Sequence, residues 1–231
     1  MTCFDMSASA FFPGVYRVQG DERKLIATVN LTPGRNVYGE QLLSFEGVEY
    51  RLWNPFRSKL GAALEKGLKS LSLRPGDRVL YLGVASGTTC SHISDIVGAE
   101  GHIWAVDFAP RSMRDFITNV VHYRKNLSPI LGDARRPDNY ASQVPEVDVI
   151  YADVAQPDQA DIVLKNAEYF LKPGGKILLA IKSRSIDVTR SPSEIYKEQK
   201  RILEQAFKVD EMLELDPYEK AHAFITATYL N

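Results

Sequence analysis

The stretch Arg78–Thr89 restricts this chain to few folds. A short apolar run, Val79–Leu82, leads into a loop of glycine and other small residues, and an apolar helix pattern follows. Such a run before such a loop is typical of a buried parallel strand. Thr88 or Thr89 is expected to cap the helix, and Gly98 is expected to end it. Together these features predict the opening strand–loop–helix unit of a nucleotide-binding α/β sheet.

The composition of the loop narrows the ligand. Gly83 and Gly87 enclose Val-Ala-Ser, and Ala85 stands where a G-x-G-x-x-G loop needs its second glycine. A pyrophosphate-binding loop is therefore disfavoured, which weakens a nicotinamide oxidoreductase, and the lysine of a P-loop is also absent. A cofactor without phosphates, such as S-adenosylmethionine, suits the loop; a plain strand–helix turn is the alternative. The candidate contacts are Gly83, Ala85, Ser86, Thr88 and Thr89.

Polar residues follow four further predicted strands. The strands are His102–Val106, Leu127–Leu131, Val147–Ala152 and Lys176–Ile181, and the residues that follow them are Asp107, Asp133, Asp153 and Lys182. Because ligands bind beyond the carboxyl ends of parallel strands, these four side chains are expected at one site.

Two of these carboxylates suggest contacts to a nucleoside. Asp107 follows the first strand by roughly the 20 residues expected of an acid that binds ribose hydroxyls, and Phe108 can lie against adenine. Asp133 can accept a hydrogen bond from the adenine amino group. Read singly, Asp107 can also be a residue that starts a helix, and Asp133 a loop residue.

The pattern as a whole predicts an α/β fold with a Rossmann-like sheet. A seven-stranded, mostly parallel sheet would carry helices on both faces and end in an antiparallel hairpin, Val209–Leu215 and Ala223–Tyr229. We expect a small β-rich accessory domain over residues 1–54 and the domain with the parallel sheet over 55–231. The accessory strands are predicted at Gly14–Val18, Lys24–Leu31, Gln41–Phe45 and Val48–Leu52.

Helices are predicted between these strands. The first, Arg57–Leu71, would bury a stripe of apolar residues, namely Phe56, Leu60, Leu64, Leu68 and Leu71. A second is predicted at Arg111–Arg124, a third from Pro157, and a fourth from the capping box that Ser191 opens.

Composition excludes several other classes of protein. The 231 residues carry a net charge of −1, so RNA binding would depend on local patches. Cys3 and Cys90 form no metal-ligand or disulfide pattern. No apolar run approaches the roughly 20 residues of a membrane span, and no signal peptide opens the chain. We expect a cytoplasmic protein.

Four motifs resemble the fibrillarin family. They are Arg51-Leu52-Trp53-Asn54-Pro55-Phe56-Arg57-Ser58-Lys59-Leu60, Tyr81–Thr89, Gly132-Asp133-Ala134-Arg135 and Ala152-Asp153-Val154-Ala155-Gln156-Pro157. The resemblance is to the archaeal form, which has no Gly/Arg-rich extension. Two positions depart from the family pattern: Asp107 stands for the usual Glu, and Ala221 stands where an acidic residue commonly precedes His222.

The resemblance implies that the α/β fold is of the Rossmann-like S-adenosylmethionine-dependent methyltransferase type, with the methyltransferase domain over residues 55–231. It also implies guide-RNA-directed ribose 2′-O-methylation of rRNA and tRNA with S-adenosylmethionine, as the catalytic subunit of a box C/D ribonucleoprotein. It implies an active-site group of Lys59, Asp153, Lys182 and His222, and cofactor contacts from Ala134, Asp153 and Gln156. Lys182 would be the base, oriented by Asp153, or both lysines would steer the hydroxyl. No metal is implied.

The implied partners are guide RNA, target RNA, a Nop-family scaffold and a kink-turn-binding, ribosomal-like protein. Another S-adenosylmethionine-dependent RNA methyltransferase and a non-catalytic assembly subunit are the alternatives. Arginines around the strand ends are candidates for phosphate binding, namely Arg57, Arg111, Arg114, Arg135, Arg136, Arg184 and Arg190.

Overall fold

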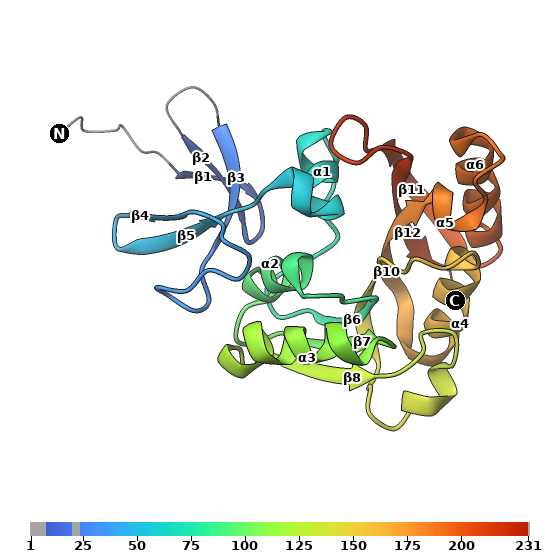
Figure 1. Cartoon of the computed structure of the whole chain (residues 1–231), viewed down its shortest axis with the longest axis horizontal. Helices are drawn as coiled ribbons and strands as arrows, with labels where there is room; N and C mark the ends of the chain where they lie inside the picture. Colours follow the sequence, from blue (N-terminus) through green and yellow to red (C-terminus); the bar gives the residue numbers. More distant parts are fainter. Residues whose placement is uncertain (1–7, 20–23, 231) are drawn as a thin grey trace.

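The computed structural model describes residues 8–19 and 24–230, which form two β-sheets (Figure 1). The N-terminal sheet is antiparallel, in the order β1-β2-β3-β5-β4. Its strands are β1 (Ala8–Phe12), β2 (Val15–Gln19), β3 (Lys24–Val29), β4 (Leu42–Phe45) and β5 (Val48–Leu52). The sequence analysis missed β1, because Ala-Ser-Ala-Phe-Phe has no β-branched residue.

The larger sheet has seven strands in the order β11-β12-β10-β9-β6-β7-β8. Strands β6 to β10 are parallel, and β12 pairs antiparallel with both β10 and β11, which confirms the predicted fold class. The strands are β6 (Arg78–Leu82), β7 (His102–Asp107), β8 (Leu127–Leu131), β9 (Val147–Ala152), β10 (Leu171–Lys182), β11 (Phe207–Glu214) and β12 (His222–Tyr229).

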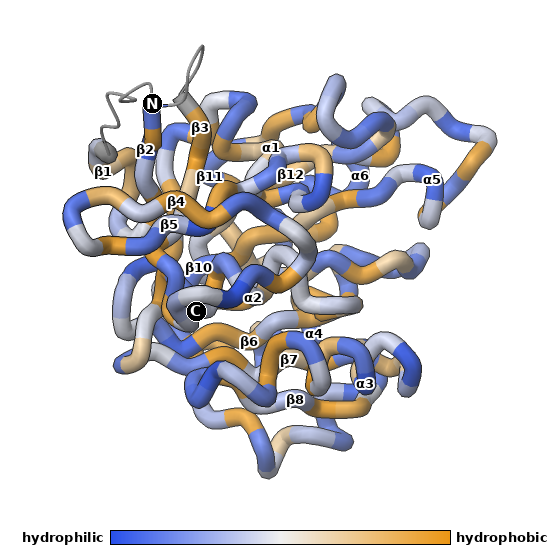
Figure 2. Tube along the Cα trace, turned by 60° about the vertical axis from the view of Figure 1, so that its left-hand side comes forward, coloured by the Kyte–Doolittle hydropathy of each residue, from blue (hydrophilic) through white to orange (hydrophobic). Residues whose placement is uncertain are grey.

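Helices cover both faces of this sheet, because successive strand residues point to opposite sides. Tyr81 packs in the hydrophobic cluster that includes residues of α1, α2 and α3, whereas Leu80 and Leu82 pack in the cluster that includes α4 and α6. Figure 2 shows hydrophobic stretches along β6 and β7 between these layers. The helices are α1 (Lys59–Glu65), α2 (Thr88–Val97), α3 (Pro110–Asn119), α4 (Gln159–Phe170), α5 (Ser183–Ile186) and α6 (Pro192–Leu203).

The helix predicted at residues 57–71 is shorter than expected. A 3-10 turn, η1 (Pro55–Arg57), precedes α1, and Ser58 between them caps α1 by accepting a hydrogen bond from the Gly61 amide. The helix ends before Gly67, whose φ of +90° is left-handed. Leu60, Leu64, Leu68 and Leu71 are buried as predicted, but Phe56 lies on the 3-10 turn and is 61% exposed.

Two other helix boundaries were also wrong. The helix predicted at residues 111–124 stops at Asn119 and is followed by the 3-10 turn η2 (Val121–Tyr123). Helix α4 begins at Gln159 and not at Pro157. By contrast, Ser191 caps α6 as predicted, accepting a hydrogen bond from the Glu194 amide.

A buried polar network joins the N-terminal sheet to α2. Arg51 of β5 is fully buried and pairs with Glu40 at 2.6 Å and with Asp95 of α2 at 2.7 Å. Arg124 also reaches Asp95, at 2.6 Å. His92 of α2 stacks on Trp53 with ring centres 4.5 Å apart. These contacts cross residue 54, so the domain boundary there stays a prediction.

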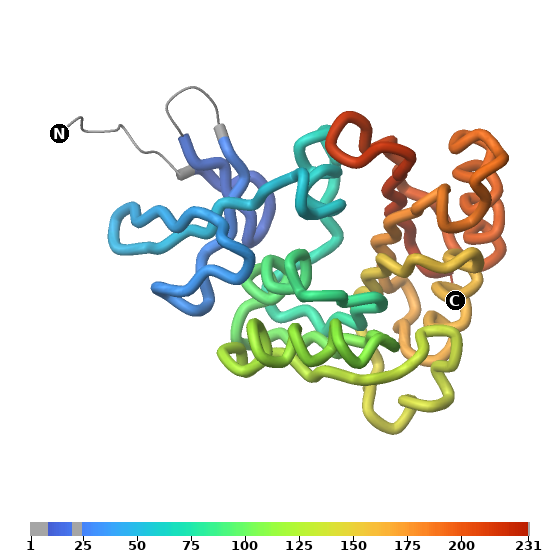
Figure 3. Tube along the Cα trace, viewed as in Figure 1, coloured from blue at the N-terminus to red at the C-terminus, as the bar shows by residue number. Residues whose placement is uncertain are grey.

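Helix α1 also lies beside a segment far away in the sequence. In Figure 3 the loop between β11 and β12 comes close to α1, and Lys66 at the end of α1 donates to the Asp216 carbonyl at 2.8 Å. The segments that carry Lys59 and His222 are thereby held next to one another.

Within residues 8–19 and 24–230, no helix is long and apolar enough to cross a bilayer. Cys90 is buried and free, whereas Cys3 lies outside the described residues.

Candidate active site

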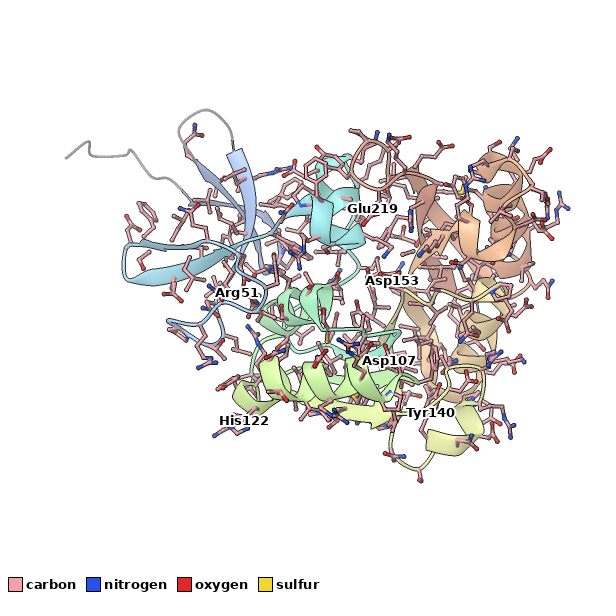
Figure 4. The ribbon with its side chains drawn as sticks, viewed as in Figure 1. Arg51, Asp107, His122, Tyr140, Asp153 and Glu219 are labelled. Carbon is pink, nitrogen blue, oxygen red and sulfur yellow. The ribbon has the colours of Figure 1, made fainter. Side chains whose placement is uncertain are left out.

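The predicted polar residues lie at one edge of the large sheet. Asp107 is the last residue of β7, Lys182 is the last residue of β10, and Asp153 directly follows β9. These strands are parallel, so their ends meet at the same edge. Figure 4 shows Asp107 and Asp153 on this side, with Glu219 near α1. The sequence analysis located this edge.

The loop after β6 approaches Asp153 closely, and this approach requires glycine. Gly83 has φ +81°, and a Cβ on it would lie 2.5 Å from the Asp153 carbonyl oxygen. Gly87 has φ +89°, and a Cβ on it would lie 2.5 Å from the Phe116 ring. Ala85 also has positive φ, +50°, and its amide donates to an Asp107 carboxylate oxygen at 2.8 Å. The loop is therefore bent around the end of β7.

The prediction that Thr88 or Thr89 caps α2 was wrong. Gly87 occupies the N-cap position in the left-handed conformation, which glycine adopts without strain, and no side chain caps the helix. Thr88 is the first helical residue. The Thr89 hydroxyl donates instead to the Ser58 hydroxyl, 2.9 Å away.

A hollow of about 270 Å³ lies between this loop and the ends of β7 and β9. Its size is near the lower end of the roughly 300–1,000 Å³ usual for ligand cavities. Four predicted cofactor residues are absent from its lining, namely Ser86, Thr88, Thr89 and Asp133. Those that line it are Gly83, Ala85, Asp107, Phe108, Ala134, Asp153 and Gln156.

The polar groups around this hollow suit a nucleoside with an amino-acid tail. Asp107 accepts from the Ala85 and Ala109 amides, at 2.8 and 2.9 Å, and its carboxylate keeps further lone pairs. The Gln156 Oε1 atom is buried and has no hydrogen-bond partner. Such an orphaned acceptor is costly unless a ligand donates to it. Phe108 is 64% exposed at the rim.

Asp133 is held by a neighbour. Its carboxylate pairs with the Arg135 guanidinium at 2.8 Å, and this hydrogen bond keeps the pKa of Asp133 below its ordinary value. Asp133 therefore remains ionised and able to accept a hydrogen bond.

Two of the four expected active-site residues, Lys59 and Asp153, pair directly. Lys59, the first residue of α1, donates from Nζ to an Asp153 carboxylate oxygen at 2.8 Å. The two side chains are 19% and 21% exposed, so the pair is accessible from outside. Lys59 engages one carboxylate oxygen, and among the described residues no hydrogen bond or ion pair joins Asp153 to Lys182, so the expectation that Asp153 orients Lys182 stays a prediction.

Lys182 is held by its backbone and not by its side chain. Its amide donates to Gln159 Oε1 at 2.9 Å, and its carbonyl accepts from Gln159 Nε2 at 3.2 Å. Among the described residues, its Nζ has neither a hydrogen-bond nor an ion-pair partner. The sequence analysis missed Gln159, although a polar residue on the buried face of α4 is an available signal.

His222 lies opposite Lys182 across the β10–β12 pair, so both side chains leave the same face of the sheet. Its Nδ1 lies 2.8 Å from the Lys220 carbonyl, which can only accept, so Nδ1 carries the proton and Nε2 is left as an acceptor. Burial lowers the pKa of His222 below 6.5, assisted by the positive charge of Lys59. The imidazole is therefore neutral at pH 7.

The fibrillarin family model matches residues 6–231 of the chain. A fibrillarin-like rRNA/tRNA 2′-O-methyltransferase of Thermococcus gammatolerans is 57% identical over 213 residues, which cover 92% of this chain and 94% of that protein. The chain belongs to the fibrillarin family.

Two solved fibrillarin structures are similar to this fibrillarin-family chain. Aeropyrum pernix fibrillarin, in complex with natively bound S-adenosyl-L-methionine, has a TM-score of 0.90 and 52% identity, with 97% of this chain and 98% of that chain covered. A fibrillarin/Nop5p complex contains a chain with a TM-score of 0.84 and 41% identity, with 94% and 98% covered.

The candidate RNA-binding arginines of this fibrillarin-family chain differ in whether their guanidinium groups have partners within the protein. Arg111 and Arg114 are exposed on α3, and Arg57 is exposed beside Phe56, with its guanidinium 5.5 Å from the Tyr38 ring centre. The others are partly engaged: Arg135 by Asp133, Arg136 by Asp138, Arg184 by the Val188 carbonyl and Arg190 by Glu198.

No group of three or more His, Cys, Asp or Glu residues suited to a metal ion occurs in the part of the chain that the structure describes.

Proposed function

We infer that this chain is an S-adenosylmethionine-dependent RNA ribose 2′-O-methyltransferase that acts on rRNA and tRNA as the catalytic subunit of a box C/D ribonucleoprotein. The observation that carries this inference is the position of Asp153, which lines the ligand hollow and also pairs with Lys59. A methyl donor held in the hollow would thus lie beside the cationic group that receives the ribose. Family membership supports the same conclusion.

We propose that the hollow holds S-adenosylmethionine, which supplies an electrophilic methyl group. Asp107 would accept from the ribose hydroxyls, Phe108 would lie against adenine, and Asp133 at the rim would accept from the adenine amino group. Gln156 Oε1 would accept from the ammonium of the amino-acid tail, which would satisfy its buried lone pairs. Gly83 and Ala85 line the hollow, and their small size allows the close approach.

In the reaction a 2′-hydroxyl must lose its proton as its oxygen attacks the methyl group. We propose that Lys182, whose Nζ is unpaired among the described residues, binds this hydroxyl and steers it or takes its proton. Lys59 and Asp153 form an ion pair beside the hollow, and this pair would place fixed charges next to the reacting hydroxyl. His222, which is neutral and held by the Lys220 carbonyl, would help to orient these active-site side chains from its place on β12.

We propose that target RNA reaches this edge over the exposed arginines. Arg57, Arg111 and Arg114 would bind phosphates, joined by Arg135, Arg136, Arg184 and Arg190 when they exchange an internal partner for RNA. Because the net charge of the chain is −1, the whole molecule adds no long-range attraction for RNA to these local contacts. A guide RNA would supply the choice of target.

We propose that the assembly also contains a Nop-family scaffold and a kink-turn-binding, ribosomal-like protein, and that it works in the cytoplasm. The solved fibrillarin/Nop5p complex, which contains a similar chain, supports the scaffold.

The cofactor assignment is tested by calorimetry on the isolated chain. We expect it to bind S-adenosylmethionine and not NAD, because Ala85 replaces the glycine that a pyrophosphate needs. Asp107→Ala should weaken binding, since it removes the proposed ribose acceptor, whereas the exposed Asp115→Ala on α3 should not. Tight NAD binding without methyl-donor binding would contradict the assignment.

The reaction is tested by reconstitution. The isolated chain should methylate RNA poorly, because its net charge is near zero and it has no recognisable RNA-binding module. Activity should appear with a Nop-family scaffold, the kink-turn-binding protein and guide RNA, and mass mapping should place the methyl group on the 2′-oxygen of a guide-paired nucleotide. Efficient, sequence-selective methylation by the chain alone, or methylation of a base, would refute the proposal.

A further inference from the structure

A buried hydroxyl pair joins the two helices that begin at the active site. Thr89 Oγ1 donates to Ser58 Oγ at 2.9 Å, and the two residues are 6% and 2% exposed. Thr89 is the second residue of α2, directly beyond the cofactor loop. Ser58 is the N-cap of α1, directly before Lys59. One hydrogen bond therefore connects the segment that surrounds the ligand hollow with the segment that carries Lys59.

Ser58 controls where α1 starts. Its Oγ atom also accepts from the Gly61 amide at 3.2 Å, so this single oxygen caps the helix and receives the Thr89 proton. Helix α1 has only seven residues, and Lys59 is the first. A helix this short derives little stability from its own hydrogen bonds. The helix is therefore positioned by the burial of residues such as Leu60 and Leu64 and, at the end that carries Lys59, by where Ser58 is held.

The other end of Lys59 returns to the same loop. Its Nζ pairs with the Asp153 carboxylate, and the Asp153 carbonyl lies against Gly83 at the start of the loop. The contacts form a closed ring that runs from Gly83 through Asp153, Lys59 and Ser58 to Thr89 and back along the loop. Two of its members have no role in the mechanism described above, namely Ser58 and Thr89.

We propose that Ser58 and Thr89 are positioning residues that hold Lys59 in register with the cofactor loop. This proposal rests on the proposed function and adds two residues that contact neither the hollow nor the Lys59 amine. It replaces the expectation that Thr89 binds the cofactor, because Thr89 does not line the hollow and its hydroxyl proton is directed to Ser58.

The test compares Thr89→Val, which removes the hydroxyl but keeps the branched shape, with Thr89→Ser, which keeps the hydroxyl. In the reconstituted complex with saturating cofactor, the single-turnover rate of Thr89→Val should fall about tenfold, since small misplacements of a catalytic group are costly. Thr89→Ser should restore most of the rate. The affinity of both variants for S-adenosylmethionine should stay within about twofold of wild type.

A second measurement separates positioning from general stability. In a Lys59→Ala background, Thr89→Val should cause no further loss of rate, because the residue that the hydroxyl pair positions is gone. In the isolated chain, Thr89→Val should accelerate hydrogen exchange at the Gly61 amide, whose acceptor is Ser58, and Thr89→Ser should not.

Three results for Thr89→Val would overturn the proposal. The first is a weakened cofactor affinity at full methylation rate, which would make Thr89 a cofactor contact. The others are an equally large loss of rate in the Lys59→Ala background, or an unchanged rate together with unchanged hydrogen exchange at the Gly61 amide. A wild-type complex that binds cofactor but methylates no RNA is a different failure. It contradicts the proposed function, and the exchange measurement still decides whether Thr89 holds Ser58.

Discussion

Replacing Lys182 with alanine should lower the single-turnover methylation rate of the reconstituted complex by a factor on the order of 10² or more, the usual scale for a positioned acid–base group. The fold should be retained, because Gln159 holds the Lys182 backbone and not its side chain. Cofactor affinity should be nearly unchanged, because Lys182 does not line the hollow. Calorimetry and a rapid-quench assay measure the two quantities separately.

Other variants place Lys182 in the mechanism. Lys182→Arg keeps a positive charge but cannot take a proton. A rate near that of wild type would indicate that Lys182 steers the hydroxyl, whereas a rate as low as that of Lys182→Ala would indicate that it is the base. Asp153→Ala should impair both rate and cofactor binding, since Asp153 contacts Lys59 and lines the hollow. Lys208→Ala, an exposed lysine on β11, is the control. Near-normal turnover of Lys182→Ala, with chemistry rate-limiting, would remove Lys182 from the mechanism.

Protonation of His222 should make the methylation rate depend on pH. Burial holds the pKa of His222 below 6.5, so the imidazole is neutral at pH 7 and gains a proton as the pH falls. If the neutral form is the competent one, the wild-type rate should decline on the acidic side through a value below 6.5, and His222→Gln should lose that decline. The loss of rate in His222→Ala should be smaller than in Lys182→Ala if His222 only positions the group.

Arg51→Ala should lower the free energy of unfolding by about 3–5 kcal/mol, the usual cost of removing one partner from a buried ion pair. Arg51 is fully buried, and its guanidinium is shared between Glu40, Asp95 and Ser91. Without it, Arg124 is the one guanidinium that Asp95 keeps among the described residues, beside the Thr28 hydroxyl and the Leu31 amide, and Glu40 keeps none. Chemical denaturation of the isolated chain measures the change.

Arg190→Ala provides the matched control. In its ion pair with Glu198 the two side chains are 40% and 42% exposed, and such exposed pairs contribute little to the free energy of unfolding because solvent screens them. If Arg51→Ala does not fold, Arg51→Lys can replace it, because lysine keeps the charge but loses the forked geometry of the guanidinium. Its loss in the free energy of unfolding should lie between that expected for Arg51→Ala and that for Arg190→Ala. A loss for Arg51→Ala no larger than that for Arg190→Ala would show that the network does not hold the two sheets together.

Local pattern in the sequence determined the parallel sheet and the position of its ligand edge. Short apolar runs that lead to Asp107, Asp153 and Lys182 located the carboxyl ends of their strands, because a strand buried on both faces reads as an apolar run, although β10 begins at Leu171 and not at Lys176. The spacing of Gly83 and Gly87 predicted the loop for a different reason: both have positive φ angles, which glycine adopts without strain. The motifs then identified the family, which gave Lys59 and His222 a role that their neighbours in sequence do not reveal.

Tertiary structure decided how these residues are paired. Lys59 meets Asp153 across 94 positions, and Arg51 meets Asp95 across 44, so no local period encodes either contact. Gly87, two residues before Thr89, occupies the N-cap position of α2, so the Thr89 hydroxyl is not needed as a cap and donates to Ser58. A sequence shows which side chains can donate or accept, but the partner is chosen by packing, which brings distant segments together and leaves each buried polar group only a few atoms within reach.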